Sequence, residues 1–267
     1  MTDVKPEKGI SMKSNRLSSL AILSVTALVL ATPIVWGNTG VSDSEINAKV
    51  VQRLNQKKVG PDVDVKVEDG MVTLGGTVES VALKETAGSE ASRIKGISSV
   101  PNNILVDAGA VSDDKILHAA SRGIRGYSFY TIFDNIELKS VNGQVLVSGQ
   151  VTQPWRREDI GRIVASVRGV RSVENNLEVL PLSPFDNEIR FRVARAIYRD
   201  PVLYRYGFQA YPPIHIIVKN GNVTLTGVLN NSLEKIVAER ASRFAATYFG
   251  LDNQLRVESE IAKEATD

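Results

Sequence analysis

Apolar and polar residues alternate along three stretches of the chain, and each alternation is centred on an Asp-Gly or Asn-Gly pair. The three stretches are 63–74, 136–147 and 214–225. Alternation with a period of two predicts a half-buried strand. Asx-Gly between two such strands predicts a tight two-residue hairpin, because both central residues of that turn adopt positive φ. The pattern therefore predicts three β-hairpins of one design.

A helix is predicted on each side of every hairpin. Before the hairpins, apolar residues recur at helical spacing after Asp43, Asp113 and Asp186, which we expect to act as N-caps. After the hairpins, helical spacing returns and is followed by a last short strand ending near 106, 179 and 257. The repeating unit is helix, hairpin, helix, strand. It predicts an α+β fold in which each unit is a three-stranded mixed sheet with two helices on one face.

The three copies align without gaps after the turn. A second glycine follows the turn glycine by six positions in every copy, at Gly76, Gly149 and Gly227. The alignment predicts domains at 41–108, 111–181 and 184–258, preceded by an N-terminal segment (1–40) and followed by a tail (259–267). Fixed-period self-similarity of this kind indicates an array of one structural unit.

The N-terminal segment has the features of an export signal. Lys13 and Arg16 precede an apolar run, Leu17–Trp36. A basic region before such a run is typical of a cleaved secretory signal, although a run of about 20 residues is also long enough to remain as an inner-membrane anchor. We favour cleavage. Translation from Met1 or from Met12 is left open.

The repeat resembles the BON domain family. The shared pattern is Asp-x-x-Ile, an Asx-Gly-x-Val-x-Leu-x-Gly hairpin, Gly-Val-x-x-Val and a closing Leu-x-Val strand. Segments 96–100 and 169–173 fit the Gly-Val-x-x-Val element, whereas 247–251 departs from it. The resemblance implies an α/β sandwich, a periplasmic location, a role in osmotic or envelope stress, and attachment to phospholipid membranes without enzymatic activity.

The amino-acid composition excludes some classes of function. The net charge of only +2 gives no sign of a nucleic-acid-binding protein, and the absence of cysteine excludes thiolate metal sites and cysteine nucleophiles. His118 and His215 are the only histidines, lack metal-ligand spacing and are interpreted as surface residues. We predict no catalytic residues, no metal and no cofactor.

The candidate binding residues lie where the copies differ. On the first helix of the third copy, Phe191, Arg195 and Tyr198 are expected opposite the apolar stripe, with Arg192 and Arg199 at its edge. Aromatic rings beside arginines suit the interface of an anionic membrane. The alternative is an ordinary solvated arginine face whose rings are covered by the 204–211 loop.

Two loops in the second and third copies, 127–133 and 204–211, are rich in aromatic residues that the first copy lacks. Tyr204 and Tyr206 belong to the second of these loops. Such rings either contact a membrane, or the loops fold back to bury the rings or to seal contacts between copies. Trp155, with Arg156 and Arg157, opens the second helix of copy two and is a further candidate.

The sequence thus favours a periplasmic protein that binds anionic phospholipid membranes through its second and third copies. The alternative is a scaffolding module that binds another envelope protein or associates with itself.

Overall fold

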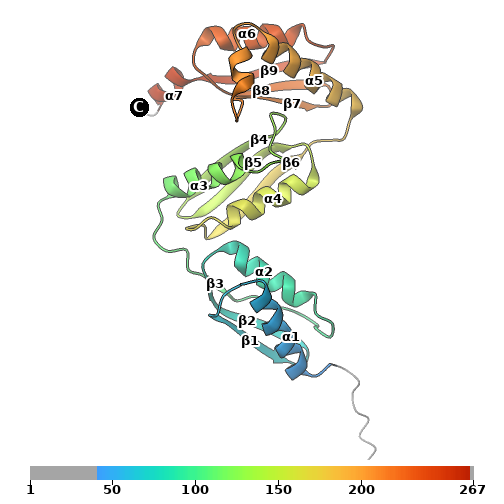
Figure 1. Cartoon of the computed structure of the whole chain (residues 1–267), viewed down its shortest axis with the longest axis vertical. Coiled ribbons are helices and arrows are strands. Elements are labelled where there is room, and N and C mark those ends of the chain that lie inside the picture. The colour runs from blue at the N-terminus through green and yellow to red at the C-terminus, as the bar shows by residue number, and fades with distance from the viewer. Residues whose placement is uncertain (1–40, 265–267) are drawn as a thin grey trace, which may run out of the picture. The chain divides into compact units, whose positions relative to one another are not determined.

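The computed structural model describes residues 41–264, in which three units of one topology follow each other along the chain (Figure 1). The predicted signal or anchor segment, 1–40, lies outside the described residues, as do 265–267. The predicted fold class is confirmed, with three three-stranded mixed sheets.

The elements of the three units correspond one to one. The first unit comprises α1 (Asp43–Gln56), β1 (Val63–Glu68), β2 (Met71–Val78), α2 (Val81–Ser92) and β3 (Leu105–Val106). The second comprises α3 (Asp113–Arg125), β4 (Asn135–Val141), β5 (Gln144–Val151), α4 (Pro154–Ala165) and β6 (Ser172–Val179). The third comprises α5 (Pro184–Arg199), the 3₁₀ helix η1 (Tyr204–Phe208), β7 (Ile214–Lys219), β8 (Asn222–Leu229), α6 (Ser232–Arg243) and β9 (Gly250–Val257).

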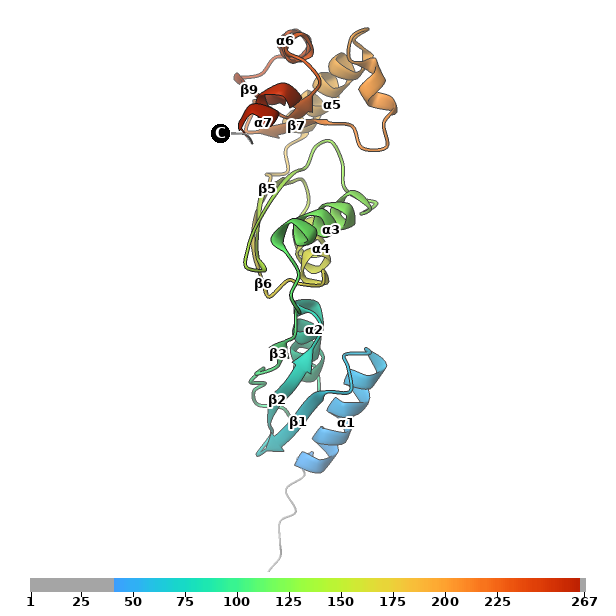
Figure 2. The ribbon, with the colours of Figure 1, turned by 90° about the vertical axis from the view of Figure 1, so that its left-hand side faces the viewer.

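Each sheet has the second hairpin strand at its centre. β1, β4 and β7 pair antiparallel with β2, β5 and β8, and β3, β6 and β9 pair parallel on the other side. Both helices of a unit cover the same face of its sheet (Figures 1 and 2). Because the second hairpin strand is central, the first strand of every unit is an edge strand.

The hairpins have the predicted register. Val67 lies opposite Val72, and Val218 lies opposite Val223, as expected for a two-residue loop. In the first turn, Asp69 and Gly70 have φ of 49° and 74°. Positive φ at both central residues is the requirement that selects Asx-Gly here.

The predicted N-caps are wrong by one to three residues, and the three aspartates have a different role. Ser42, Ser112 and Ser183 occupy the N-cap positions. The helix aspartates instead accept hydrogen bonds from the backbone N–H groups of the hairpin turns. The bonded pairs of turn residues are Asp69 and Gly70 for Asp43, Asn142 and Gly143 for Asp113, and Asn220 and Gly221 for Asp186. We call each of these arrangements the aspartate clasp.

Each unit has its own apolar core between the helices and the sheet. In the third unit, the core includes Ile189 and Val193 of α5, Ile216 of β7 and Leu225 of β8, all of them buried. The first and second units repeat this arrangement with smaller side chains.

The predicted C-terminal tail begins with helical residues. A short helix, α7 (Glu258–Glu264), directly follows β9. Within residues 41–264, none of the helices is long and apolar enough to cross a membrane.

Candidate functional site

The predicted binding residues of α5 fall into an exposed group and a buried one. Phe191 is 63% exposed, and Arg195 and Arg199 are exposed on the same side of the helix. Arg192 is also exposed but forms an ion pair with Glu188 at 2.6 Å. Within the described part of the chain, no hydrogen bond or ion pair involves Arg195 or Arg199, so both guanidinium groups are available to a ligand.

Tyr198 does not share this face, contrary to the helical projection. Its ring packs against the core of the third unit, and its hydroxyl donates a hydrogen bond of 2.6 Å to the carbonyl oxygen of Ile214. Burial raises the pKa of the Tyr198 hydroxyl well above its usual value. The side chain leans back towards the sheet because η1 lies against it, with Gly207 next to the ring. Tyr198 therefore has a structural role.

The aromatic residues of η1 also fall into an exposed group and a buried one. Tyr204 is 53% exposed and packs edge to face with Phe208 at 6.1 Å between ring centroids. Tyr206 is buried and donates a hydrogen bond of 2.7 Å to the carboxylate of Glu234 on α6. The prediction that Tyr206 belongs to a contact surface is therefore wrong.

In the second unit, Trp155 and Arg157 remain accessible while Arg156 does not. Trp155 is 49% exposed at the start of α4, and Arg157 bonds the carbonyl oxygen of Asn175 at 3.3 Å. Arg156 forms a 2.5 Å ion pair with the fully buried Asp134. A buried charge is retained only when it is paired, so Arg156 stabilises the loop before β4 and is not free to bind a ligand.

The aromatic loop of the second copy seals a contact with the third unit, which was one of the two interpretations of its sequence. Ile132 and Phe133 pack against the core of the third unit, and the ring of Phe133 meets that of Phe191 at 5.4 Å. The carbonyl oxygen of Ile132 accepts a 2.8 Å hydrogen bond from the amide of Ile216 in β7. This loop therefore contacts the edge strand of the next unit through one backbone hydrogen bond and apolar packing.

His215 lies at this contact, and its interpretation as an ordinary surface residue is wrong. Its Nδ1 lies 2.6 Å from the carbonyl oxygen of Asp134, and its ring lies 5.6 Å from that of Tyr130. Burial lowers the pKa of the imidazole. Among residues 41–264, no group of histidine and carboxylate side chains could hold a metal ion.

One part of the exposed surface was missed by the sequence reasoning. Leu233 and Ile236 of α6 are 62% and 63% exposed, and Phe244 just after the helix is 86% exposed. Arg240 lies on the same stripe. The spacing i, i+3, i+7, i+11 in the sequence is the signal that indicates this stripe.

The outer surface of the helical layer in the third unit thus combines apolar side chains with arginines. It comprises Phe191, Arg195 and Arg199 of α5, Tyr204 and Phe208 of η1, and Leu233, Ile236, Arg240 and Phe244 of α6 and its end. We call this set the third-unit helical surface. It has the composition of an interaction surface and offers no nucleophile paired with a base.

The topology defines a tandem array of three small αββαβ modules. The BON domain family model matches residues 42–108, 131–181 and 185–259. The chain therefore belongs to the BON domain family. In the second unit, the match begins after α3.

A curated relative supports this assignment. Osmotically-inducible protein Y of Escherichia coli (strain K12) is 28% identical over 156 residues, which cover 52% of this chain and 73% of the relative.

Solved structures resemble the chain only weakly. The C-terminal domain of CdsD, the structural protein of the type III secretion system of Chlamydia trachomatis, is 14% identical with a TM-score of 0.23, over 81% of this chain and 99% of that one. The PrgH periplasmic domain is 13% identical with a TM-score of 0.21, over 77% and 98%. TM-scores this low establish no common arrangement of the whole chains.

Proposed function

We propose that this BON-family chain is a non-enzymatic protein of the bacterial envelope that associates with anionic phospholipid through its third-unit helical surface. The observation that carries the proposal is the exposure of large apolar side chains next to Arg195 and Arg199, which have no acidic partner in the described part of the chain, whereas Arg240 pairs with Asp200 at 3.9 Å. Ten of the seventeen exposed large apolar residues in the described part of the chain belong to the third unit. The third unit therefore exposes more large apolar side chains than the other two units.

The chemistry of this surface matches the membrane interface. Exposed rings such as Phe191 and Tyr204 gain free energy by entering the boundary between headgroups and acyl chains. Arg195 and Arg199 can bond headgroup phosphates, and each basic residue near an anionic leaflet contributes about 1 kcal/mol. Neither effect requires a deep pocket, in agreement with the convex outline of a helical layer.

The relative and the N-terminal segment support the cellular setting. A relative with the name osmotically-inducible protein Y favours a role in osmotic stress of the envelope. The basic residues and apolar run before residue 37 favour export to the periplasm. Both remain parts of the proposal.

Vesicle flotation tests the proposal. We expect the full chain to float with phosphatidylglycerol-containing vesicles and to stay behind with phosphatidylcholine alone, where the attraction to anionic headgroups is missing. The combined change Phe191→Ser and Arg195→Glu should reduce retention by about tenfold, since it removes an inserting ring and reverses a charge. Leu233→Ser with Ile236→Ser should have a comparable effect from α6.

A matched change in the second unit is the control. Trp155→Ser with Arg157→Glu removes one ring and reverses one charge as well, and it should leave retention within about twofold of the wild type. Loss of retention in this control alone would move the membrane contact to the second unit. Equal flotation of all variants would overturn the assignment to the third-unit helical surface.

A further inference from the structure

The edge strand β4 of the second unit has unused backbone hydrogen-bonding groups. Val141 and Gln144 flank the two-residue turn and therefore bond each other, so the pairs with β5 alternate from that point. By this alternation, Ile136, Leu138 and Ser140 point their N–H and C=O groups away from β5. Within residues 41–264, no hydrogen bond reaches the outward groups of these three residues.

The corresponding edge of each of the other two units receives a hydrogen bond from the first helix of its unit. In β1, the outward carbonyl oxygen of Val65 accepts a 3.1 Å hydrogen bond from the side chain of Asn47 in α1. In β7, the outward carbonyl oxygen of Val218 accepts one of 2.5 Å from Arg190 in α5. The β7 edge also receives Tyr198 and the loop of the second unit, as described above.

One position in the first helix of each unit explains why β4 lacks this hydrogen bond. Asn47 and Arg190 both lie four residues after the clasp aspartate of their helix, and the same position in α3 is Leu117. A leucine side chain cannot donate a hydrogen bond. The β4 edge is left open because its helix presents an apolar residue where the other two present a donor.

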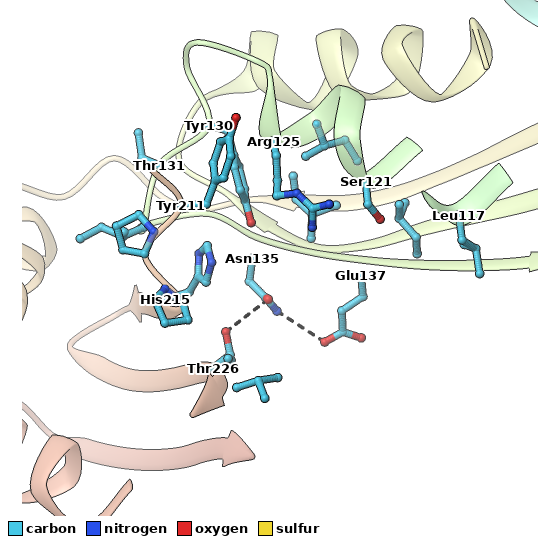
Figure 3. A pocket seen from close by; sticks show the side chains of 18 of the residues that line it. Leu117, Ser121, Arg125, Tyr130, Thr131, Asn135, Glu137, Tyr211, His215 and Thr226 are labelled. Carbon is cyan, nitrogen blue, oxygen red and sulfur yellow. Dashed lines mark hydrogen bonds between the residues drawn. The ribbon is translucent and has the colours of Figure 1, made fainter. Parts of the chain in front are cut away.

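A groove runs along this open edge. It has a volume of about 1430 Å³ and is lined by β4 residues from Asn135 to Lys139, by Leu117 and Ser121 of α3, and by third-unit residues from the segment before β7 and from β7, β8 and β9. Its end at Asn135 is bounded by Thr226 of the third unit, which bonds the Asn135 side chain at 3.2 Å, and the carboxylate of Glu137 points into the open part (Figure 3). An additional strand placed against β4 would lie in this groove.

We propose that the occupant is β4 of a second copy of the chain, paired antiparallel across a two-fold axis at Leu138. Backbone pairing between edge strands is a common mode of recognition, and a two-fold axis makes the contact self-complementary. In this register, Leu138 bonds the second copy's Leu138, and Ile136 bonds the second copy's Ser140. All three outward-pointing residues then find partners.

The charges on the strand select that register. Glu137 and Lys139 are exposed on the open face of the sheet, and Glu137 accepts only a long 3.5 Å hydrogen bond from Asn135. With the axis at Leu138, each Glu137 lies opposite a Lys139, in the closer, non-hydrogen-bonded type of pair. An axis at Glu137 would oppose two glutamates, and an axis at Lys139 would oppose two lysines. The axis at Leu138 is the only one that gives both charges an opposite partner.

Strand β1 carries a similar charge pattern but is a poorer acceptor. An axis at Val65 would oppose Asp64 and Lys66, but it would also bring Asp62 opposite Glu68 at each end, and like charges in this position are destabilising. The bond from Asn47 would have to break as well. The open edge and the balanced charges coincide only at β4.

Charge reversal tests the register. We expect the full chain to dimerise in sedimentation velocity at about 100 µM, an ordinary affinity for a small interface. Glu137→Lys and Lys139→Glu should each weaken dimerisation by about tenfold, because each places like charges opposite one another, and the double variant should restore it. Thermal unfolding monitored by circular dichroism confirms that each variant is folded. A monomeric wild type, unaffected single variants or an unrestored double variant would each overturn the proposal.

Cysteine crosslinking provides an independent test, since the chain has no cysteine of its own. Glu137→Cys and Lys139→Cys chains, mixed and oxidised, should form a disulfide-linked dimer, because the two positions lie opposite each other. Each variant alone should crosslink far less, as its cysteines are diagonal across the axis. Equal crosslinking in the mixture and in the separate samples would contradict the register. Neither test depends on membrane binding, so a negative result for the dimer would leave the proposed lipid contact unaffected.

Discussion

Single residues fix the geometry of the repeated hairpin, and the glycine six positions after the turn shows how. A Cβ atom on Gly227 would lie 1.8 Å from the carbonyl oxygen of Pro213, and on Gly149 it would lie 2.1 Å from that of Asn135. The same residues have φ of +130° and +112°. The backbone of the first strand passes so close to the second that only glycine fits. The recurrence of this glycine is therefore a packing requirement and carries no information about function.

Substitution of this glycine should be strongly destabilising. We expect Gly227→Ala to lower the free energy of unfolding by about 3 kcal/mol or more, because both the φ value and the backbone contact oppose a side chain. Gly109→Ala is the control, since its φ of +65° is also positive but no atom lies within 4 Å of the added Cβ. Gly109→Ala should therefore lower the free energy of unfolding by no more than about 1 kcal/mol. Urea unfolding measures both values, and equal losses would show that strain alone is responsible.

At the scale of elements, sequence periodicity was sufficient for the helices, hairpins and sheet order, because each is fixed by local spacing and turn chemistry. The orientation of individual rings was not predictable in this way. Tyr198 and Tyr206 looked equivalent to their exposed neighbours in projection, but Ile214 and Glu234 provide buried hydrogen-bonding partners from distant parts of the chain. Arg156 was misplaced for the same reason, since its partner Asp134 precedes it by 22 residues.

The contact between the loop before β4 and the edge of β7 should depend on pH through His215. Burial lowers the pKa of this imidazole below its usual value of 6.5, so the folded contact favours the neutral ring. The stabilisation is complete above pH 6.5 and is lost as the pH falls through the lower folded pKa, because the unfolded state binds the proton more readily in that window. Tyr130, Asp134, Arg156 and Arg190 are the other charged or titratable groups around this contact, and histidine is the residue type that ordinarily changes its charge in this pH window.

Hydrogen exchange of the Ile216 amide between pH 7.5 and 5.5 checks this prediction, after correction for the intrinsic rate. We expect protection to decrease towards pH 5.5 in the wild type and to be independent of pH in His215→Gln, which cannot be protonated. The same decrease in His215→Gln would assign the effect to another group.

At the scale of the whole molecule, a dimer would carry two copies of the third-unit helical surface. Linked binding sites increase the apparent affinity when both reach the same membrane. Lys139→Glu leaves the third-unit helical surface unchanged, yet it should reduce retention on dilute phosphatidylglycerol vesicles by about tenfold or more. Flotation at several protein concentrations measures the effect, and the difference should shrink as the protein is diluted below the dimer dissociation constant. Equal retention at all concentrations would mean that only one of the two surfaces engages a membrane at a time.

The aspartate clasp also governs how the units can diverge. It joins residues 27, 30 and 35 positions apart in the three copies, so the helix and the turn stay fixed while the segment between them varies in length. The entropy of closing a loop grows only with the logarithm of its length, and the step from the shortest to the longest copy costs about 0.2 kcal/mol. Insertions before the first strand therefore cost little folding free energy. The loop of the second copy that contacts the third unit, 127–133, lies at this position. A new binding loop could be grafted at the same position of another unit without disturbing the fold.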